Sequence, residues 1–181
     1  MAEKLSKTDW LQAGFRALTK AGPQALKAEP LARKLNVSKG SFYWHFKDID
    51  DFKNAMIEHW QQAATADVIA QISAGTAEPE AKLRALVKHS TAQPRGAYGG
   101  PAVEPAIRDW ARYDAKIASV VKTIDGQRLV FTEALFQAAN HPQPAQAARL
   151  LYGALVGLEI LATQGLSNPE DDLVALLDTL I

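Results

Sequence analysis

The chain has 181 residues, of which 48% are hydrophobic and 22% charged, and it contains no cysteine. These values are ordinary for a soluble globular protein with one large domain, or with a small domain joined to a larger one. The lack of cysteine excludes disulfides, thiolate metal sites and cysteine nucleophiles, and it suits a reducing cytosol. No apolar signal stretch opens the sequence and no apolar run approaches the roughly 18 residues of a membrane span, so we expect a cytoplasmic protein.

Basic charge is concentrated near the N-terminus, although the formal net charge is zero. Residues 1–50 hold nine Lys and Arg against five acids, whereas residues 51–181 hold eleven against fifteen. This asymmetry is typical of a small DNA-binding head on a larger body. The alternative is an uneven scatter of surface charge.

Apolar residues recur at helical spacing along the chain, and no segment alternates as a strand does. The first helix is predicted to begin with Thr8 as its N-cap and to end at Gly22. Two short helices follow over 28–35 and 38–45. A long helix is predicted over 48–73. The later helices are expected over 79–93, 104–111, 114–139 and 145–165 and from 170 onward, with breaks at 94–101, 140–144 and 167–169.

The predicted fold class is therefore all-α. Residues 1–50 are expected to form a three-helix head with a helix-turn-helix, and residues 51–181 a larger helical body for ligand binding and dimerisation. The long helix over 48–73 joins the two, so the boundary falls on a helix rather than in a loop.

Residues 31–46 have the pattern of a helix, a tight turn and a second helix. Asn36 stands where the turn requires a positive φ, which Asn tolerates better than most residues. Ser38 is predicted to be the N-cap of the second helix. Phe42 and Phe46 are four residues apart, so both can anchor this helix inward.

The opposite face of the second helix carries chemistry that suits DNA. Lysines there neutralise phosphates and a tyrosine hydroxyl donates to a phosphate oxygen, whereas Ser41 and Trp44 are placed to meet base edges or thymine methyls. Gly40 lets the backbone approach the groove. The predicted DNA-binding residues are Arg33, Ser38, Lys39, Gly40, Ser41, Tyr43, Trp44, His45 and Lys47. The alternative is a plain three-helix bundle, but residues 42–46 cannot all face one core.

These motifs resemble those of the TetR family of transcriptional regulators. The likeness rests on Leu31-Ala32, Val37-Ser38-Lys39-Gly40-Ser41 and Phe42-Tyr43-Trp44-His45-Phe46-Lys47, and it covers about residues 8–55. Residues 104–114 are similar to a motif in the ligand-binding domain of some members. The resemblance implies a homodimer whose two heads enter successive major grooves of a near-palindromic operator. It also implies a repressor that a small molecule in the body releases from DNA.

The sequence departs from the family pattern at two places. The second helix begins near Lys27 and Pro30 without the usual Ser or Thr cap, and Ile49 stands where a lysine is common. Both changes remove an expected phosphate contact, so we expect moderate non-specific affinity. A ligand-binding or protein-partner module whose head binds DNA poorly is the rival interpretation.

Two further sets of residues are predicted in the body. The last two helices carry leucines and small residues that suit either a dimer contact or the core of the monomer. The predicted dimer interface comprises Leu151, Ala154, Leu155, Leu158, Leu173 and Leu177. The predicted ligand pocket comprises Trp60, His89, Tyr98, Trp110, Tyr113, Phe131, Phe136 and Tyr152, any of which could instead be core.

Enzyme chemistry finds little support in the sequence. The four histidines show no metal-ligand spacing, and there is no nucleophile motif or phosphate-binding loop. We therefore predict no catalytic residues, no metal and no cofactor.

Overall fold

The computed structural model describes residues 5–75, 78–91, 100 and 102–181. Within these ranges every regular element is helical, as the all-α prediction required. The elements are α1 (Lys7–Ala21), the short 3-10 helix η1 (Pro23–Ala25), α2 (Ala28–Lys34), α3 (Lys39–Tyr43), α4 (Ile49–Gln61), the π-helical turn η2 (Gln62–Ala66), α5 (Asp67–Ala74), α6 (Pro79–Thr91), α7 (Val103–Ala111), α8 (Ala115–Ala138), α9 (Pro144–Thr163) and α10 (Pro169–Leu180).

Capping residues set the ends of α1. Ser6 is the N-cap: its hydroxyl oxygen accepts from the Asp9 backbone N–H at 3.2 Å, and the Asp9 carboxylate accepts from the Ser6 N–H at 2.8 Å. This reciprocal capping box satisfies two backbone donors, so the predicted cap at Thr8 is wrong. The helix ends at Gly22, whose φ of 73° falls where glycine is favoured, as predicted.

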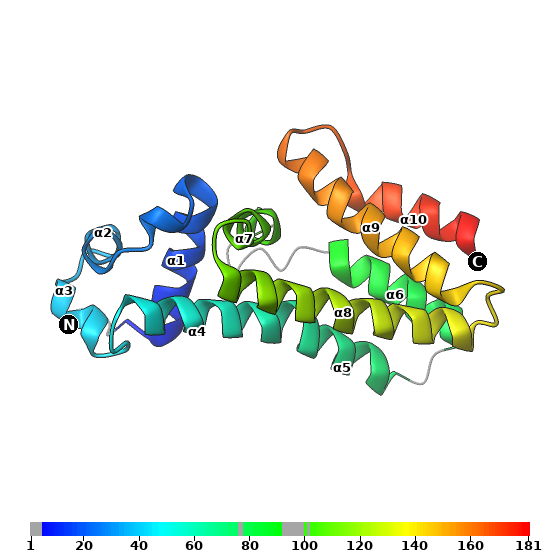
Figure 1. The fold of residues 1–181 in the computed structure, drawn as a ribbon, viewed down its shortest axis with the longest axis horizontal. Helices are drawn as coiled ribbons and strands as arrows, with labels where there is room; N and C mark the ends of the chain where they lie inside the picture. The colour runs from blue at the N-terminus through cyan, green and yellow to red at the C-terminus, as the bar shows by residue number, and fades with distance from the viewer. Residues whose placement is uncertain (1–4, 76–77, 92–99, 101) are drawn as a thin grey trace.

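The molecule is elongated, with a head of α1, α2 and α3 at one end (Figure 1). The α4–η2–α5 path and α8 run along its length, α7 lies over the middle, and α6, α9 and α10 form the far end (Figure 1). The single long helix predicted over 48–73 is thus a continuous helical path interrupted by a π-helical turn.

Two hydrophobic cores lie along this axis. The first joins the head to α4, α7 and the start of α8, and it includes the fully buried Trp10, Phe42, Trp60 and Ile107. The second joins α5, α6, α9 and α10 to the end of α8 around Phe136. Because the first core continues from the head into α7 and α8, head and body share packing well beyond residue 50.

The last two helices divide the predicted dimer residues between two environments. Leu151, Leu173 and Leu177 are buried in the second core, and Ala154, Leu155 and Leu158 pack against it, so all six contact their own chain. The apolar residues that face outward on α9 and just beyond it are Leu150, Ile160, Leu161 and Leu166. Gly153 and Gly157 lie on α9 with open space above them.

By length and composition alone, α9 could cross a membrane, and among the described residues it is the one helix of which this is true. One such helix is weak evidence for a span. Its face toward the body carries Tyr152 and Glu159, which belong to the polar site described below.

Candidate DNA interface and effector cavity

The helix-turn-helix forms with the backbone geometry that the sequence predicts. α2 ends at Lys34, and Asn36 has a φ of 54°, the left-handed conformation expected for the turn. Ser38 is the N-cap residue of α3 with an extended backbone, but its side chain makes no capping hydrogen bond. The hydroxyl therefore stays accessible at the entrance to α3. Lys27 at the start of α2 likewise provides no side-chain cap, as the sequence indicates.

An aromatic cluster fixes the orientation of α3. Phe42 is fully buried, with its ring centroid 5.4 Å from those of both Trp10 and Phe52. Phe46 is also buried and lies 4.9 Å from Phe52. Since these two phenylalanines are held inward, the residues between them turn outward: Trp44 is 83% exposed. A large aromatic side chain with so little packing suits contact with a partner.

The other predicted DNA-binding residues lie on or beside this outward face. Most are exposed, and Ser41 and His45 are half-buried. Arg33 lies 3.3 Å from Glu29 in an ion pair whose side chains are 79% and 65% exposed, so the pair is weak and a phosphate can compete for the guanidinium. The exposed members are Arg33, Ser38, Lys39, Gly40, Tyr43, Trp44 and Lys47.

Gly40 has no internal reason to be glycine. A Cβ built on it would meet only the Ser38 hydroxyl oxygen, at an ordinary 3.6 Å. The fold therefore leaves room for a side chain here, and close approach of a partner is the physical reason that remains for glycine.

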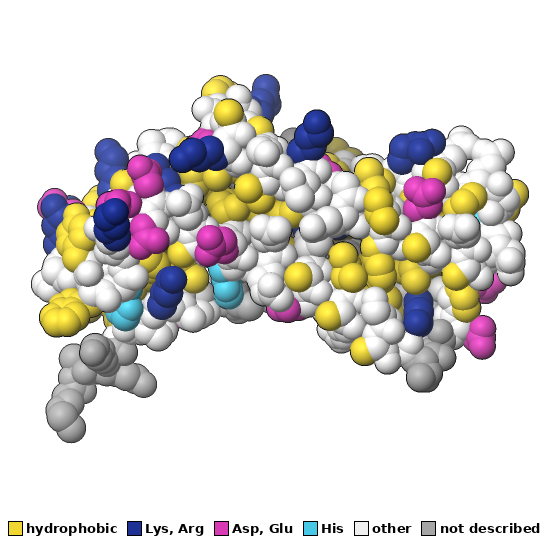
Figure 2. Space-filling view, turned by 60° about the horizontal axis from the view of Figure 1, so that its bottom comes forward, with side chains coloured by type: hydrophobic (Ala, Val, Ile, Leu, Met, Phe, Trp, Pro, Cys, Tyr) yellow, Lys and Arg dark blue, Asp and Glu magenta, His cyan; other side chains and the backbone are white. Residues whose placement is uncertain are grey.

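The acids that follow α3 serve the next helix. Asp48 is the N-cap of α4, and its carboxylate accepts from the backbone N–H groups of Asp50 and Asp51 at 3.0 and 2.8 Å. Asp51 in turn accepts from the Lys47 backbone N–H at 2.9 Å. Their role in starting α4 explains why acids occur beside an otherwise basic surface. Figure 2 shows basic and acidic side chains crowded together at the head end, while hydrophobic side chains gather over the body.

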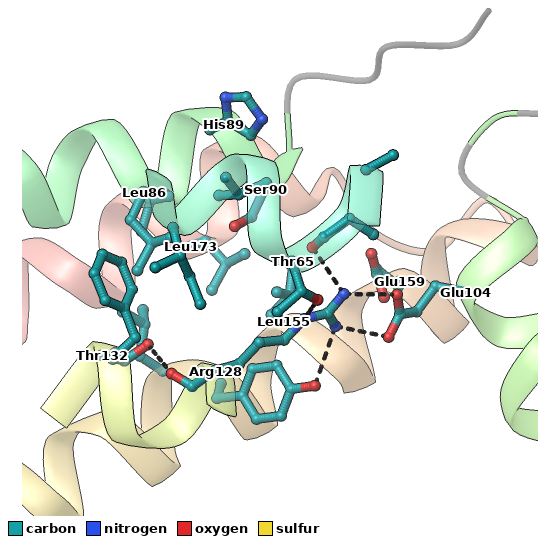
Figure 3. A pocket seen from close by; sticks show the side chains of 18 of the residues that line it. Thr65, Leu86, His89, Ser90, Glu104, Arg128, Thr132, Leu155, Glu159 and Leu173 are labelled. Atoms are coloured by element: carbon teal, nitrogen blue, oxygen red, sulfur yellow. Dashed lines mark hydrogen bonds and ion pairs between the residues drawn. The ribbon is translucent and has the colours of Figure 1, made fainter. Parts of the chain in front are cut away.

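The body encloses a cavity of about 110 Å³ between η2, α6, α8 and α9 (Figure 3). Of the predicted pocket residues, His89, Phe131 and Tyr152 line it. Trp60, Trp110 and Phe136 belong to the two cores instead, and Tyr113 is 81% exposed. Tyr98 lies outside the described residues.

A buried network of charged groups lies beside the cavity, and its members Glu104, Arg128 and Tyr152 line the cavity wall. Glu104 on α7, only 6% exposed, accepts from Arg108 at 2.9 Å, from Arg128 at 2.8 Å and from the Trp60 indole at 3.1 Å. Asp125 accepts from both terminal nitrogens of Arg108 at 2.7 and 3.1 Å and from the Tyr152 hydroxyl at 2.7 Å. Two arginines are thus matched by two carboxylates, as buried charges require.

Arg128 connects this network to the π-helical turn. Its Nε donates to the Thr65 hydroxyl at 3.0 Å and its Nη2 to the Ala64 carbonyl oxygen at 3.0 Å, while it also contacts Glu104 (Figure 3). π-turns of this kind interrupt regular helices and occur frequently at functional sites. Here the turn allows one side chain of α8 to bind the α4–η2–α5 path and α7 together.

The environment shifts the pKa values of the network. Burial opposes charge on Arg108, but the hydrogen bonds to Asp125 and the charge of Glu104 outweigh it and raise the pKa of this arginine. Burial raises the pKa of Tyr152 to about 12, although the nearby arginines oppose it. Burial tends to raise the pKa of Asp125. Its hydrogen bonds with Arg108 and Tyr152 lower this pKa by more, so the net shift is downward. Arg108 and Asp125 are therefore ionised at neutral pH, and the Tyr152 hydroxyl keeps its proton.

Glu159, on α9, is the exception. Burial and the neighbouring charge of Glu104 raise the pKa of this carboxyl to about 8, and the two arginines offset only part of that rise. No residue of the described part of the chain forms a hydrogen bond or ion pair with Glu159.

Sequence reasoning missed Glu104, Thr65 and Glu159 as cavity residues. Residues 104–114 gave one signal, because they resembled a ligand-domain motif that contains Glu104 and Arg108. Among the residues that the structure describes, no group of three His, Asp or Glu side chains could hold a metal ion.

Comparison with known proteins identifies the head. Residues 11–56 match the family model described as "Bacterial regulatory proteins, tetR family". Over these residues the chain is similar to the N-terminal domain of TetR-family regulators. The proteins that this model describes are bacterial regulators. A search of curated proteins finds no match.

Solved structures extend the likeness of fold to the whole chain. A TetR transcription regulator from Haloarcula marismortui is 18% identical with a TM-score of 0.74, over 96% of this chain and 93% of that one. A candidate regulator from Saccharomonospora viridis in complex with choline is 16% identical with a TM-score of 0.78, over 96% and 93%. SmeT, the repressor of the Stenotrophomonas maltophilia multidrug efflux pump SmeDEF, is 18% identical with a TM-score of 0.72, over 98% and 89%. At these identities the likeness establishes the TetR fold.

Proposed function

We propose that the protein is a cytoplasmic, homodimeric repressor that a small molecule in the body cavity releases from a near-palindromic operator. The observation that carries the proposal is the Arg128 network, which joins the cavity wall to η2 and α7. Trp44, Lys39 and Lys47 on and beside α3 supply the DNA contacts.

The path from cavity to head runs through α7. Glu104 and Arg108 face the network, whereas Val103, Ile107 and Trp110 on the same helix lie in the first core with the head. Protein interiors are close-packed, so a displacement of Glu104 is passed on to the residues that pack beneath it. A ligand that binds one arrangement of α7 better than the other shifts the spacing of the two heads.

The dimer is proposed to form through the outward stripe of α9. Leu150, Gly153, Gly157 and Ile160 follow one another at three- and four-residue spacing, and all are exposed in the single chain. The glycines permit close approach of a second α9, which would cover the apolar stripe. The core leucines of α9 and α10 support this surface from below.

Selection of DNA from a random pool by the purified protein tests whether the two heads of a dimer bind one operator. The expected product is an inverted repeat with half-sites about one or two helical turns apart, bound by two protomers. A Gly153→Glu variant is expected to be monomeric and to bind this DNA weakly. A single asymmetric half-site, or no enrichment at all, would reject the proposal and favour a body that acts without DNA.

Ligand release needs its own test. In the Leu155→Trp variant the larger side chain fills the cavity. A compound that raises the Tm of the wild type but not of this variant therefore binds in the cavity. Such compounds are expected to weaken operator binding by the wild type and to leave the operator affinity of the Leu155→Trp variant unchanged. Cavity ligands that leave operator affinity unchanged would contradict ligand release.

A further inference from the structure

Among the described residues, the cavity and the charged network beside it hold one carboxyl more than their two arginines pair with. Arg108 and Arg128 are matched by Glu104 and Asp125 at distances of 2.7 to 2.9 Å. Glu159 is a third carboxyl, and it lines the cavity without a hydrogen bond or ion pair to any described residue. The charges of the two arginines and two carboxylates therefore cancel, and an ionised Glu159 adds one uncompensated negative charge among the described residues.

Glu159 is placed to meet a ligand. It follows Tyr152 and Leu155 on α9 at seven and four residues, so all three share one face of the helix, and all three line the cavity. Figure 3 shows its carboxyl beside Glu104, at the polar end of a space whose other end is apolar. Leu86 and Leu173 lie at the apolar end (Figure 3), and Phe131 also lines the cavity.

We propose that the effector of this cavity is a compact organic cation, whose positive group pairs with Glu159 while its apolar part contacts Leu155 and Phe131. This inference rests on the proposed function, since it names the chemical class of the releasing ligand. A cavity of about 110 Å³ is smaller than the ~300–1,000 Å³ of sites for drug-sized ligands, which favours a small molecule.

The arginines do not suit an anionic ligand. Arg128 already donates to Thr65, Ala64, Glu104 and Tyr152, and Arg108 to Glu104, Asp125 and Tyr152. An anion would have to displace a carboxylate that belongs to the fold and would face Glu159 as well. A cation needs no such exchange, because Glu159 has no hydrogen-bond or ion-pair partner among the residues that the structure describes.

Cation binding is expected to be coupled to proton release. Among the described residues, the charged groups that act on Glu159 are Glu104 and Arg108 from α7 and Arg128 from α8. The titratable side chains that line the cavity with it are Tyr152 from α9 itself and His89 from α6. With a pKa of about 8, Glu159 is about 90% protonated at pH 7 in the free protein. A bound cation favours the ionised carboxylate, so the proton leaves as the ligand binds.

Calorimetric titration with choline tests the proposal, because its quaternary ammonium keeps its charge at every pH. The matched probes are its uncharged carbon isostere 3,3-dimethylbutan-1-ol and the anion 3,3-dimethylbutanoate. Choline is expected to bind most tightly, with its affinity rising about tenfold between pH 7 and pH 9 as Glu159 ionises. Titrations in two buffers of different ionisation enthalpy should give about 0.9 proton released per choline at pH 7.

Glu159→Gln keeps the shape of the side chain and removes its charge. This variant is expected to bind choline roughly 30-fold more weakly at pH 9, the loss typical of removing one partner of a buried charge pair. It should also lose both the pH dependence and the proton release. Glu133→Gln, a carboxyl on α8 outside the cavity, should behave as the wild type does.

Three results would overturn the cation assignment: no saturable choline binding, equal binding of choline and its uncharged isostere, or unchanged choline affinity in Glu159→Gln. Measuring whether the operator complex dissociates distinguishes a wrong cation assignment from a wrong proposed function. If the uncharged or anionic isostere binds in the cavity and releases DNA, ligand release stands and the cation assignment is wrong. If choline binds through Glu159 but DNA stays bound, the cation assignment stands and ligand release is wrong.

Discussion

Replacing Glu159 with Gln is expected to change how the stability of the protein depends on pH. Burial and the charge of Glu104 raise the pKa of Glu159 from its ordinary 4.5 to about 8, so the native state holds this proton more tightly than the unfolded chain. Between these two values the unfolded state binds fewer protons, and the free energy of unfolding therefore falls as pH rises. Integrating the two titrations from pH 6 to pH 9 gives a loss of about 2–3 kcal/mol from this single carboxyl. That figure is an upper limit, because the side chain is only partly shielded from solvent.

Glu159→Gln resembles the protonated carboxyl at every pH and should not lose stability in this way. Urea unfolding of both proteins at pH 6, 7, 8 and 9, at one protomer concentration, measures the difference, since the protomer concentration affects the stability of a dimer. The variant is expected to gain on the wild type as pH rises, by 1 to 3 kcal/mol over the range, estimated as about 1.4 kcal/mol per pH unit of differential titration with solvent screening allowed for. Parallel curves would show that Glu159 titrates normally and would refute the argument from burial.

The DNA-binding face gives further predictions. Lys39→Ala should weaken binding to all DNA sequences alike and lower the slope of log K against log salt by about one, measured by fluorescence anisotropy. Trp44→Ala should change which sequences are selected while altering stability by less than about 0.5 kcal/mol, because the side chain is exposed; an unchanged preference would exclude base reading. Gly40→Ala should weaken DNA binding and leave stability equal or about 0.5–1 kcal/mol higher, whereas Gly14→Ala should destabilise by about 1–3 kcal/mol, because its Cβ would lie 2.6 Å from Met56 and Phe52. Thermal unfolding beside anisotropy distinguishes the two glycines.

The head could be predicted from the sequence because its signals are local. Asn36, Gly22 and the pair Phe42 and Phe46 each act within a few residues of themselves, through backbone preference or helical spacing. The same local reasoning placed the first cap at Thr8 instead of Ser6. Both residues are natural caps, and the choice depends on Asp9 reaching back to Ser6.

The cavity could not be predicted because its residues meet through packing between distant segments. Arg128 contacts Thr65 and Glu104, which lie 63 and 24 residues away along the chain. Aromatic character alone does not identify a pocket residue, since the predicted pocket residues Trp60 and Trp110 lie in the first core. Periodicity marks which face of a helix is apolar, but it does not distinguish a face that is filled from a face that borders a space.

The energetic cost of the Arg128 network argues that it serves signalling more than stability. Buried ion pairs are often no more stabilising than apolar side chains of similar volume, because the charges lose their hydration. Here Arg108 even leaves its Nε buried without a hydrogen-bond partner. Such a network does, however, have more than one way to pair its charges, whereas an apolar core does not. A cation at Glu159 would change the field at Glu104, on which both arginines depend, and Glu104 lies on the helix that packs against the head. We therefore propose that the network acts as a relay more than as a stabiliser of the fold, and its position between the two cores suits that role.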